Sequence, residues 1–564
     1  MRYLRKIDSL SIVRLAITLF FIMFLIIPLI SVFLVSFTRD PINLFGSLIS
    51  IEELVNTIEQ FKNATIDSYI DIASRSGYLF SLTNSLTLSI SVSIIIVIMC
   101  LPIAYGIART SMPFKKVISA LCIVPLVIPT FIAADSITLM FGKAGWVTNL
   151  YNMLGGEGML IDPYSLLGIA IVQVFFFFPY ALWPMVAAFR VSDITLEEGS
   201  KNLGAKNWFT FIFITLPLAI PGILSSLLLV FTVSFSDFGA PIILAPKDTS
   251  LLVVDTYREM TGFFNWGGAS ILTVVMIVVA GIFLWLQRLV AGKMSYGVIS
   301  GRQGVQSLNR DKKVTTLLAL YSFIVVFIPF FAGLSILVQS FATTWGDSIL
   351  PNGFTLSNYE NILSTSYESL INTMILAIGA LVVSILVTAP LTYFVVRKNA
   401  TKLDFISSIP LVVPGVALAV ALTVTFNTAP LKLTGTVTLL IIAFAIRRLP
   451  YMVRSTMGTM QSIKKDIEEA SINMGASRLT TILTIIAPLM LPGIIAGSIL
   501  VFVTVVKETS VSVMMAPAEW APMTLTIFEF LLRGEHYPAA AMAVIMIVIV
   551  LILQIIAERL TSSN

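Results

Sequence analysis

Long apolar runs, separated by short polar segments, repeat along the whole chain. A membrane-spanning helix needs about 20 mostly apolar residues, because the hydrocarbon core is about 30 Å thick and lipid offers the backbone no hydrogen-bond partner. The sequence therefore predicts an all-α integral membrane protein with about twelve spanning helices. The apolar runs lie at roughly 12–36, 80–108, 117–141, 165–190, 210–236, 269–290, 314–341, 370–396, 404–427, 433–453, 480–506 and 538–557.

Composition agrees with this pattern and removes several kinds of chemistry. Hydrophobic residues make up 57% of the chain and charged residues only 12%, whereas a soluble domain carries roughly a quarter of charged residues. The two cysteines, Cys100 and Cys122, both fall inside predicted spans, so no disulfide framework is expected. His536 is the only histidine, which argues against a histidine metal site or proton relay, and we expect no metal site and no cofactor in this chain.

The distribution of positive charge predicts the topology. Most of the 35 Lys and Arg residues fall at the N-terminus and in segments that alternate with pairs of spans. Because cytoplasmic loops are rich in Lys and Arg, both termini are predicted to be cytoplasmic. This bias accounts for the net charge of +5 without a nucleic-acid partner. The predicted cytoplasmic segments lie near 109–116, 190–209, 288–313, 397–403, 447–479 and 558–564.

An internal repeat divides the chain into two halves. The segment from Glu197 to Ala205 matches the segment from Glu468 to Ala476, 271 positions later. Six predicted spans in each half give the two repeats the same orientation, which makes them parallel repeats with a solute path expected at their interface. We predict a first half at 1–290, a polar cytoplasmic linker at 291–313, and a second half at 314–564.

The repeated segment predicts a short cytoplasmic helix, a sharp turn and a second helix that leads into the membrane. Gly204 and Gly475 suit the position just after a helix, where a positive φ is needed and glycine adopts it without strain. Pro217 and Pro488 follow at the same spacing and are expected to loosen the next span. One such segment is ordinary, but two at equivalent places indicate a function.

This segment resembles the EAA loop in the permeases of binding-protein-dependent ABC importers, and the resemblance covers nearly the whole chain twice. Gly199 and Ser200 stand where the family usually has two alanines, and the second copy has Ala470 and Ser471. The chain is most similar to fused, ferric-iron type permeases. Permeases for 2-aminoethylphosphonate, other phosphorylated solutes, thiamine and polyamines resemble it almost as well.

The resemblance implies a type I importer permease that works by alternating access. Its loops at 193–209 and 464–480 would dock on ATPase subunits. It also implies two copies of a cytoplasmic ATPase, an extracytoplasmic solute-binding protein and a place in the bacterial plasma membrane. The ATPase-coupling residues carried over from the family are Glu197, Glu198, Gly204, Ala205, Glu468, Glu469, Gly475 and Ala476.

The chain is not expected to be an enzyme. A P-loop needs the pattern Gly-x4-Gly-Lys-[Ser/Thr] to hold phosphates. The Gly-Lys pairs at Gly142 and Gly292 lack both the first glycine and the final hydroxyl residue. ATP and magnesium are therefore expected on the partner ATPase.

Charged residues near the membrane are candidates for the solute pathway or its gate. Asp237 and Glu508 occupy equivalent positions at the predicted outer ends of the two fifth spans, and Asp135 lies within the third span. Arg258 and Glu529 occupy roughly equivalent outer segments. These residues line a cavity or gate between the halves, or they make only interfacial caps and ion pairs.

Arg447 and Arg448 are expected to reach the cytoplasmic face or to touch the ATPase.

A secondary transporter would carry coupling carboxylates deep in its spans, where this chain has little besides Asp135. A membrane enzyme would need a nucleophile with its base, and the sequence offers no convincing pair.

Overall fold

The computed structural model describes residues 9–38, 40–191, 194–246, 249–293, 311–345 and 348–562. These residues form helices and loops, with one isolated β-bridge between Ala342 and Phe354. Most of the predicted linker 291–313 falls outside the described residues, as does residue 193 at the start of the first predicted loop.

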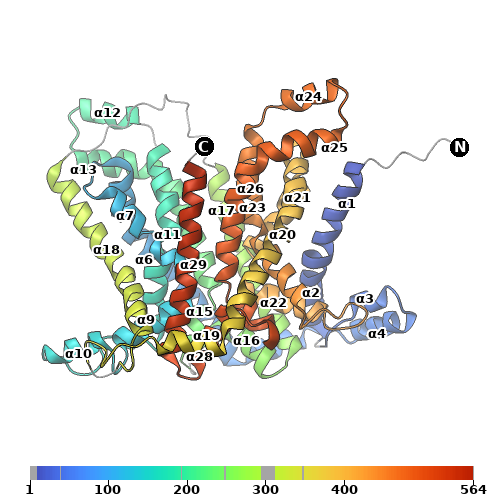
Figure 1. The fold of residues 1–564 in the computed structure, drawn as a ribbon, viewed down its shortest axis with the longest axis horizontal. Coiled ribbons are helices and arrows are strands. Elements are labelled where there is room, and N and C mark those ends of the chain that lie inside the picture. Colours follow the sequence, from blue (N-terminus) through green and yellow to red (C-terminus); the bar gives the residue numbers. More distant parts are fainter. Residues whose placement is uncertain are drawn as a thin grey trace. The chain divides into compact units, whose positions relative to one another are not determined.

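The chain forms two compact units, and each unit combines parts of both sequence halves (Figure 1). Unit 1 contains residues 1–75, 255–277 and 359–564, and unit 2 contains 76–254 and 278–358. The boundaries 1–290 and 314–564 describe the sequence repeat and stay a prediction.

Nine helices in the described part of the chain are long and apolar enough to cross a membrane, and two bent helix pairs raise this number to eleven. The remaining predicted run, 433–453, corresponds to α23 (Val437–Ser462), a 26-residue helix that carries Arg447 and Arg448. The nine helical stretches are Leu10–Thr38, Gly77–Arg109, Leu166–Arg190, Asn207–Phe235, Trp266–Leu289, Lys312–Ser340, Tyr367–Lys398, Arg478–Val506 and His536–Ile556.

The two bent pairs break at matching prolines. One pair turns by 103° between Val127 and Thr130, and the other by 108° between Leu411 and Gly415. Pro129 and Pro414 directly precede the second helix of each pair. Proline has no N–H to donate and restricts the residue before it, so a helix is expected to end there.

In unit 2, three long helices form the core: α6 (Ser76–Arg109), α11 (Leu166–Val191) and α14 (Leu216–Phe235). The bent third span comprises α7 (Lys115–Leu121), α8 (Val124–Val127) and α9 (Thr130–Phe141), and α18 (Lys312–Ser340) packs against it and against α6. The shorter or outlying helices are α10 (Trp146–Met153), α12 (Ile194–Asn202), α13 (Asn207–Thr210), η2 (Phe211–Thr215) and α15 (Gly239–Leu244).

In unit 1, the equivalent core helices are α20 (Tyr367–Lys398), α23 and α26 (Ala487–Val506). The bent pair here is α21 (Thr401–Ser408) with η4 (Ile409–Leu411), followed by α22 (Gly415–Thr425). The chain's first span, α1 (Ser9–Phe21), η1 (Ile22–Ile26) and α2 (Ile27–Thr38), packs on α20, α21, α22 and α23. Phe24 stacks on Phe426, with ring centroids 5.4 Å apart.

The first span of each sequence half is thus grouped with core helices of the other half. α1, η1 and α2 pack within unit 1, and α18 packs within unit 2. The other elements are α3 (Leu44–Ser47), α4 (Ile51–Lys62), α5 (Asp67–Ser74), α16 (Leu252–Tyr257), η3 (Arg258–Gly262), α17 (Trp266–Lys293), α19 (Ser357–Thr365), α24 (Lys465–Asn473), α25 (Arg478–Thr481), η5 (Ile482–Ile486), α27 (Ser510–Met515), η6 (Ala518–Trp520), α28 (Met523–Leu532) and α29 (His536–Ser562).

Each fifth span begins with a widened turn. The π-helical segments η2 and η5 end one residue before the first residues of α14 and α26, and Pro217 and Pro488 are the second residues of those helices. A proline inside a helix clashes with the carbonyl one turn earlier, and a π-bulge relieves that clash. The expected loosening at these prolines therefore takes the form of a π-bulge just before each proline.

Candidate functional site

The first repeated segment folds as a helix, a tight turn and a second helix within unit 2. Helix α12 ends at Asn202, and Gly204 adopts a φ of +86°. The Gly204 amide donates to the Lys201 carbonyl at 2.9 Å, and the Ala205 amide donates to the Ser200 carbonyl at 3.1 Å. These two bonds define a Schellman motif, which satisfies the last carbonyls of a helix.

The second repeated segment reproduces this turn within unit 1. Gly475 follows α24 and has a φ of +92°. Its amide donates to the Ile472 carbonyl at 2.9 Å, and the Ala476 amide donates to the Ser471 carbonyl at 3.2 Å. The expectation that both glycines adopt a positive φ after a helix is correct.

A hydroxyl pair closes each turn from the inside. Ser200 and Thr210 are 3.0 Å apart between their side-chain oxygens, and Ser471 and Thr481 are 2.9 Å apart. All four residues are buried. The serines that replace the family's second alanine therefore join the two helices of each loop, a role that sequence reasoning missed.

The first glutamate of the first segment faces the protein interior. Glu197 is 8% exposed, and Thr215 donates to its Oε1 at 2.8 Å. Arg109, the last residue of α6, lies 3.6 Å from the same carboxylate oxygen. This contact joins the loop to the second span of its own sequence half.

The equivalent glutamate in unit 1 makes the same kind of contact with α20. Arg397 lies 3.3 Å from Glu468, and the Tyr393 hydroxyl donates to Glu468 at 2.5 Å. Arg397 also donates at 2.7 Å to the carbonyl of Ile463, two residues before α24 begins. Both segments are therefore joined to the last turn of a core helix by an arginine–glutamate pair.

The second glutamate and the tip of each segment face outward. Glu198 and Glu469 are exposed. Leu203 and Met474, which precede the two turn glycines, are 90% and 82% exposed. Each loop therefore exposes one large apolar side chain directly before its turn glycine.

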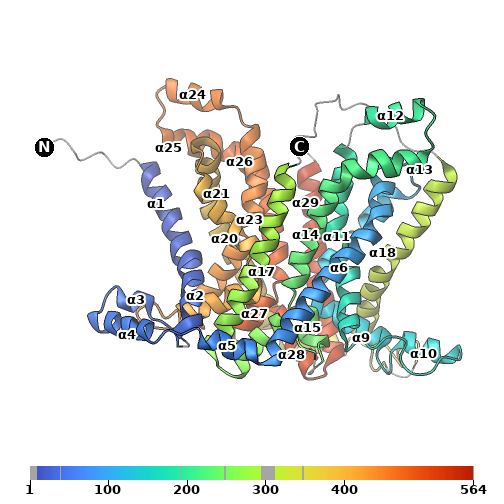
Figure 2. The ribbon, with the colours of Figure 1, turned by 180° about the vertical axis from the view of Figure 1, so that it is seen from behind.

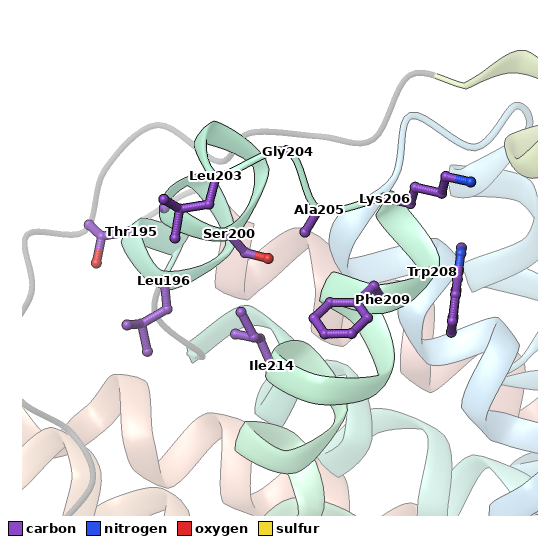
Figure 3. Close-up of a pocket in the computed structure, with 11 residues that line it drawn as sticks. Thr195, Leu196, Ser200, Leu203, Gly204, Ala205, Lys206, Trp208, Phe209 and Ile214 are labelled. Atoms are coloured by element: carbon purple, nitrogen blue, oxygen red, sulfur yellow. The ribbon is translucent and has the colours of Figure 1, made fainter.

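A cavity of about 820 Å³ lies beside the first loop, between α12 and the start of the fifth span (Figure 3). Leu196, Phe209 and Ile214 line it, together with Leu203 at the tip. Its lining is mainly apolar, and Lys206 supplies a charged group.

The carboxylate of Asp237, in unit 2, has neutral partners. Thr130 donates to Asp237 at 2.7 Å, and Gln173 donates at 3.0 Å. Gln173 in turn accepts from Ser234 at 2.6 Å. A Cβ at Gly239 would lie 2.3 Å from the Thr130 hydroxyl, so glycine is needed for this close approach.

The buried carboxylate of Glu508, in unit 1, has charged partners instead. Arg447 donates through its Nε to Glu508 at 2.9 Å, and Arg448 contacts the same carboxylate oxygen. Glu508 is 2% exposed. A Cβ at Gly415 would lie 2.6 Å from the Arg447 guanidinium carbon, so this glycine makes room for the arginine.

These arginines correct one expectation. Arg447 and Arg448 do not reach for the cytoplasmic end of their helix, because their guanidinium groups turn to Glu508. Arg447 lies ten residues, or about 15 Å, into α23. Glu508 therefore contacts the middle of that helix.

Two of the other charged candidates each pair with a residue on the same helical stretch. Arg258 pairs with Asp255 at 3.5 Å, and Glu529 pairs with Arg533 at 3.2 Å, each within one helical turn. Asp135 is 6% exposed in the first turns of α9. A role of these residues in the solute pathway or its gate stays a prediction.

Each unit thus carries one loop of the same helix–turn–helix geometry beside helices long and apolar enough to cross a membrane. The family model for the binding-protein-dependent transport system inner membrane component matches residues 100–296 and 393–563. These two matches cover more than half of the chain and include both loops. The chain therefore belongs to this family.

Individual relatives agree with the family. The chain is 30% identical to a ferric transport system permease of Actinobacillus pleuropneumoniae over 84% of this chain and 70% of the relative. It is 29% identical to a putative ferric transport system permease of Haemophilus influenzae over 79% and 72%. A putative 2-aminoethylphosphonate permease of Salmonella paratyphi A is 24% identical over 41% of this chain and 89% of its own length.

Proposed function

We propose that this chain forms the translocation pathway of an ATP-driven importer and couples to ATPase subunits through its two repeated loops. The recurrence of one loop geometry in both units carries the proposal. Each loop has the same Schellman turn, the same hydroxyl pair and the same inward glutamate. A loop held together by these contacts can move as one body when an ATPase subunit displaces it.

The arginine–glutamate pairs determine which helices a moving loop would displace. Glu197 contacts Arg109 at the end of α6, and Glu468 contacts Arg397 in the last turns of α20. Movement of a loop on a closing ATPase is therefore passed to a core helix as well as to the fifth span. Glu198 and Glu469, which face outward, would contact the ATPase.

The transport cycle that suits this arrangement is alternating access. Two ATPase copies, one for each loop, close on ATP and move the loops, and the pathway opens to the other side. A solute-binding protein then delivers solute there, and hydrolysis resets the cycle. This cycle requires both loops to lie in the cytoplasm, and the Lys and Arg bias of the sequence favours the same side for both termini.

Ferric iron is the solute that the relatives favour, because two of the permeases similar to most of the chain are named as ferric transport permeases. A phosphonate is the second candidate. It is favoured by the relative named as a putative 2-aminoethylphosphonate permease.

Co-purification tests the coupling claim. We expect Leu203→Asp with Met474→Asp to lower the amount of ATPase subunit that co-purifies with the chain by at least tenfold. Each change puts a charge on an exposed apolar tip, so folding should be unaffected. Leu350→Asp with Leu532→Asp is the matched control, because these leucines are 71% and 63% exposed and lie outside the loops. Equal retention of the ATPase by both variants contradicts coupling through the loops.

A further inference from the structure

The segment between the first two spans contains an amphipathic helix, α4. Its apolar side chains recur three and four positions apart, which places them on one face. These side chains are 39–81% exposed rather than packed in a core. They are Ile51, Leu54, Val55, Ile58 and Phe61.

That apolar face suits the membrane surface. A helix with a strong apolar face and a polar opposite face lies in the plane of the interface. Within unit 1, α4 lies near the end of the bundle opposite to the end that carries α24 (Figures 1 and 2). If α24 meets the cytoplasmic ATPase, α4 lies at the outer surface with its polar face toward water.

The segment is fixed to the rest of unit 1. Tyr69 and Ser36 are 2.6 Å apart between their hydroxyl oxygens, and the Thr65 amide donates to the Phe37 carbonyl at 3.2 Å. Phe45 stacks on Phe426, with ring centroids 5.6 Å apart. The polar face of α4 is therefore held in a defined place.

A cavity of about 580 Å³ opens on this polar face. Glu53, Asn56, Glu59 and Gln60 line it from α4, and Thr428 lines it from the segment after α22. The Thr428 hydroxyl is buried without a hydrogen-bond partner. The cavity is thus built from two segments far apart in the sequence, and it offers carboxylates, amides and a free hydroxyl.

The charge of the cavity selects a cation. Residues 39–75 contain six acidic and three basic side chains, and both charged residues that line the cavity are acidic. In the described part of the chain, no group of three or more His, Cys, Asp or Glu residues could hold a metal ion. Two carboxylates among amides suit an ammonium or guanidinium group, which hydrogen-bonds to both.

We propose that this cavity docks a basic loop, with Lys or Arg at its tip, from the solute-binding protein. The inference rests on the proposed function, which requires such a protein at the outer surface. The apolar face of α4 fixes the cavity at the membrane surface, and Glu53 and Glu59 attract and orient the incoming protein. Complementary charges at an interface speed docking and fix its register.

The test uses the full complex of chain and ATPase in nanodiscs. The probe is the purified binding protein that stimulates ATP hydrolysis by the unmodified complex. We expect Glu53→Lys with Glu59→Lys to raise the Kd for this protein at least tenfold at low salt. The difference should shrink as salt rises, because salt screens exposed charges. Glu53→Gln with Glu59→Gln, which keeps side-chain shape, should raise the Kd by a smaller factor.

Glu52→Lys with Glu360→Lys is the matched control, because it makes the same charge change at exposed glutamates outside the cavity. The proposal is overturned if the cavity variants bind like the unmodified complex, or if the control weakens binding as much as they do. Basal ATP hydrolysis, which does not need the cavity, reports on folding. If no binding protein stimulates ATP hydrolysis by the unmodified complex, that result contradicts the proposed function itself. Failure of the proposed function is therefore distinguishable from failure of the cavity proposal.

Discussion

Asp237 and Glu508 stand at equivalent positions in the repeat, yet their surroundings differ in kind. Asp237 is held by Thr130 and Gln173, which are neutral. Glu508 is held by Arg447 and Arg448. Both halves therefore have a carboxylate after the fifth span. In unit 2 it accepts hydrogen bonds from neutral side chains, and in unit 1 it belongs to a buried ion cluster.

The exchange is traceable residue by residue. The repeat aligns Phe176 and Phe177 with the two arginines, and it aligns Thr130 with Gly415. The loss of the threonine side chain makes the space that the Arg447 guanidinium fills. Breaking a buried ion cluster costs more than losing one neutral hydrogen bond, so the two sites should respond very differently to matched substitutions.

The largest effect is expected for Glu508→Gln. This variant leaves two guanidinium groups buried without their carboxylate, which costs about 3–5 kcal/mol. The midpoint of thermal unfolding of the purified chain in detergent should fall clearly. An unchanged midpoint would show that the two arginines find other counter-charges. Glu508 would then not be the centre of a buried ion cluster, and the contrast with Asp237 would be wrong.

The second effect is a rescue. Arg447→Phe and Arg448→Phe, added to Glu508→Gln, give unit 1 the side chains that unit 2 has at the aligned arginine positions. Replacing a buried ion cluster by apolar side chains is often neutral, so stability should return to within about 1 kcal/mol of the unmodified chain. The same thermal measurement checks this result. A triple variant less stable than Glu508→Gln alone would contradict it.

A smaller effect is expected for Asp237→Asn. The new amide keeps an oxygen that accepts from Thr130, but its NH2 group replaces the oxygen that accepts from Gln173. One lost buried hydrogen bond costs about 1–2 kcal/mol. The decrease in unfolding midpoint should lie well below that of Glu508→Gln, and an equal or larger decrease would reverse the order that we predict.

The smallest effect is expected for Glu529→Gln. This residue pairs with Arg533 one turn away, and both side chains are about half exposed. Exposed pairs contribute about 0–1 kcal/mol, so the unfolding midpoint should hardly move. Any decrease comparable to that of Asp237→Asn would show that Glu529 has a further partner.

Local features were predictable from the sequence. The turns at Gly204 and Gly475 depend on short-range backbone geometry, and the loosening before Pro217 and Pro488 depends on a missing donor. The family assignment was also predictable, because the repeated loop carries it. The helical class follows from apolar run length alone.

Features that join distant segments were not predictable. Arg447 and Glu508 are 61 residues apart, and nothing near either one indicates the other. The local sequence therefore predicts only that Arg447 and Arg448 reach for the membrane surface. The grouping of α18 with core helices of the first sequence half also depends on packing partners rather than on local pattern.

ATP-dependent uptake is the most direct test of the central claim. Proteoliposomes holding this chain, its ATPase and its binding protein would be supplied with radiolabelled ferric iron. We predict uptake well above that of liposomes with a catalytically inactive ATPase. No iron uptake, together with ATP-driven uptake of 2-aminoethylphosphonate, would keep the importer and change its solute. Uptake of solute that continues unchanged with the inactive ATPase would contradict the account.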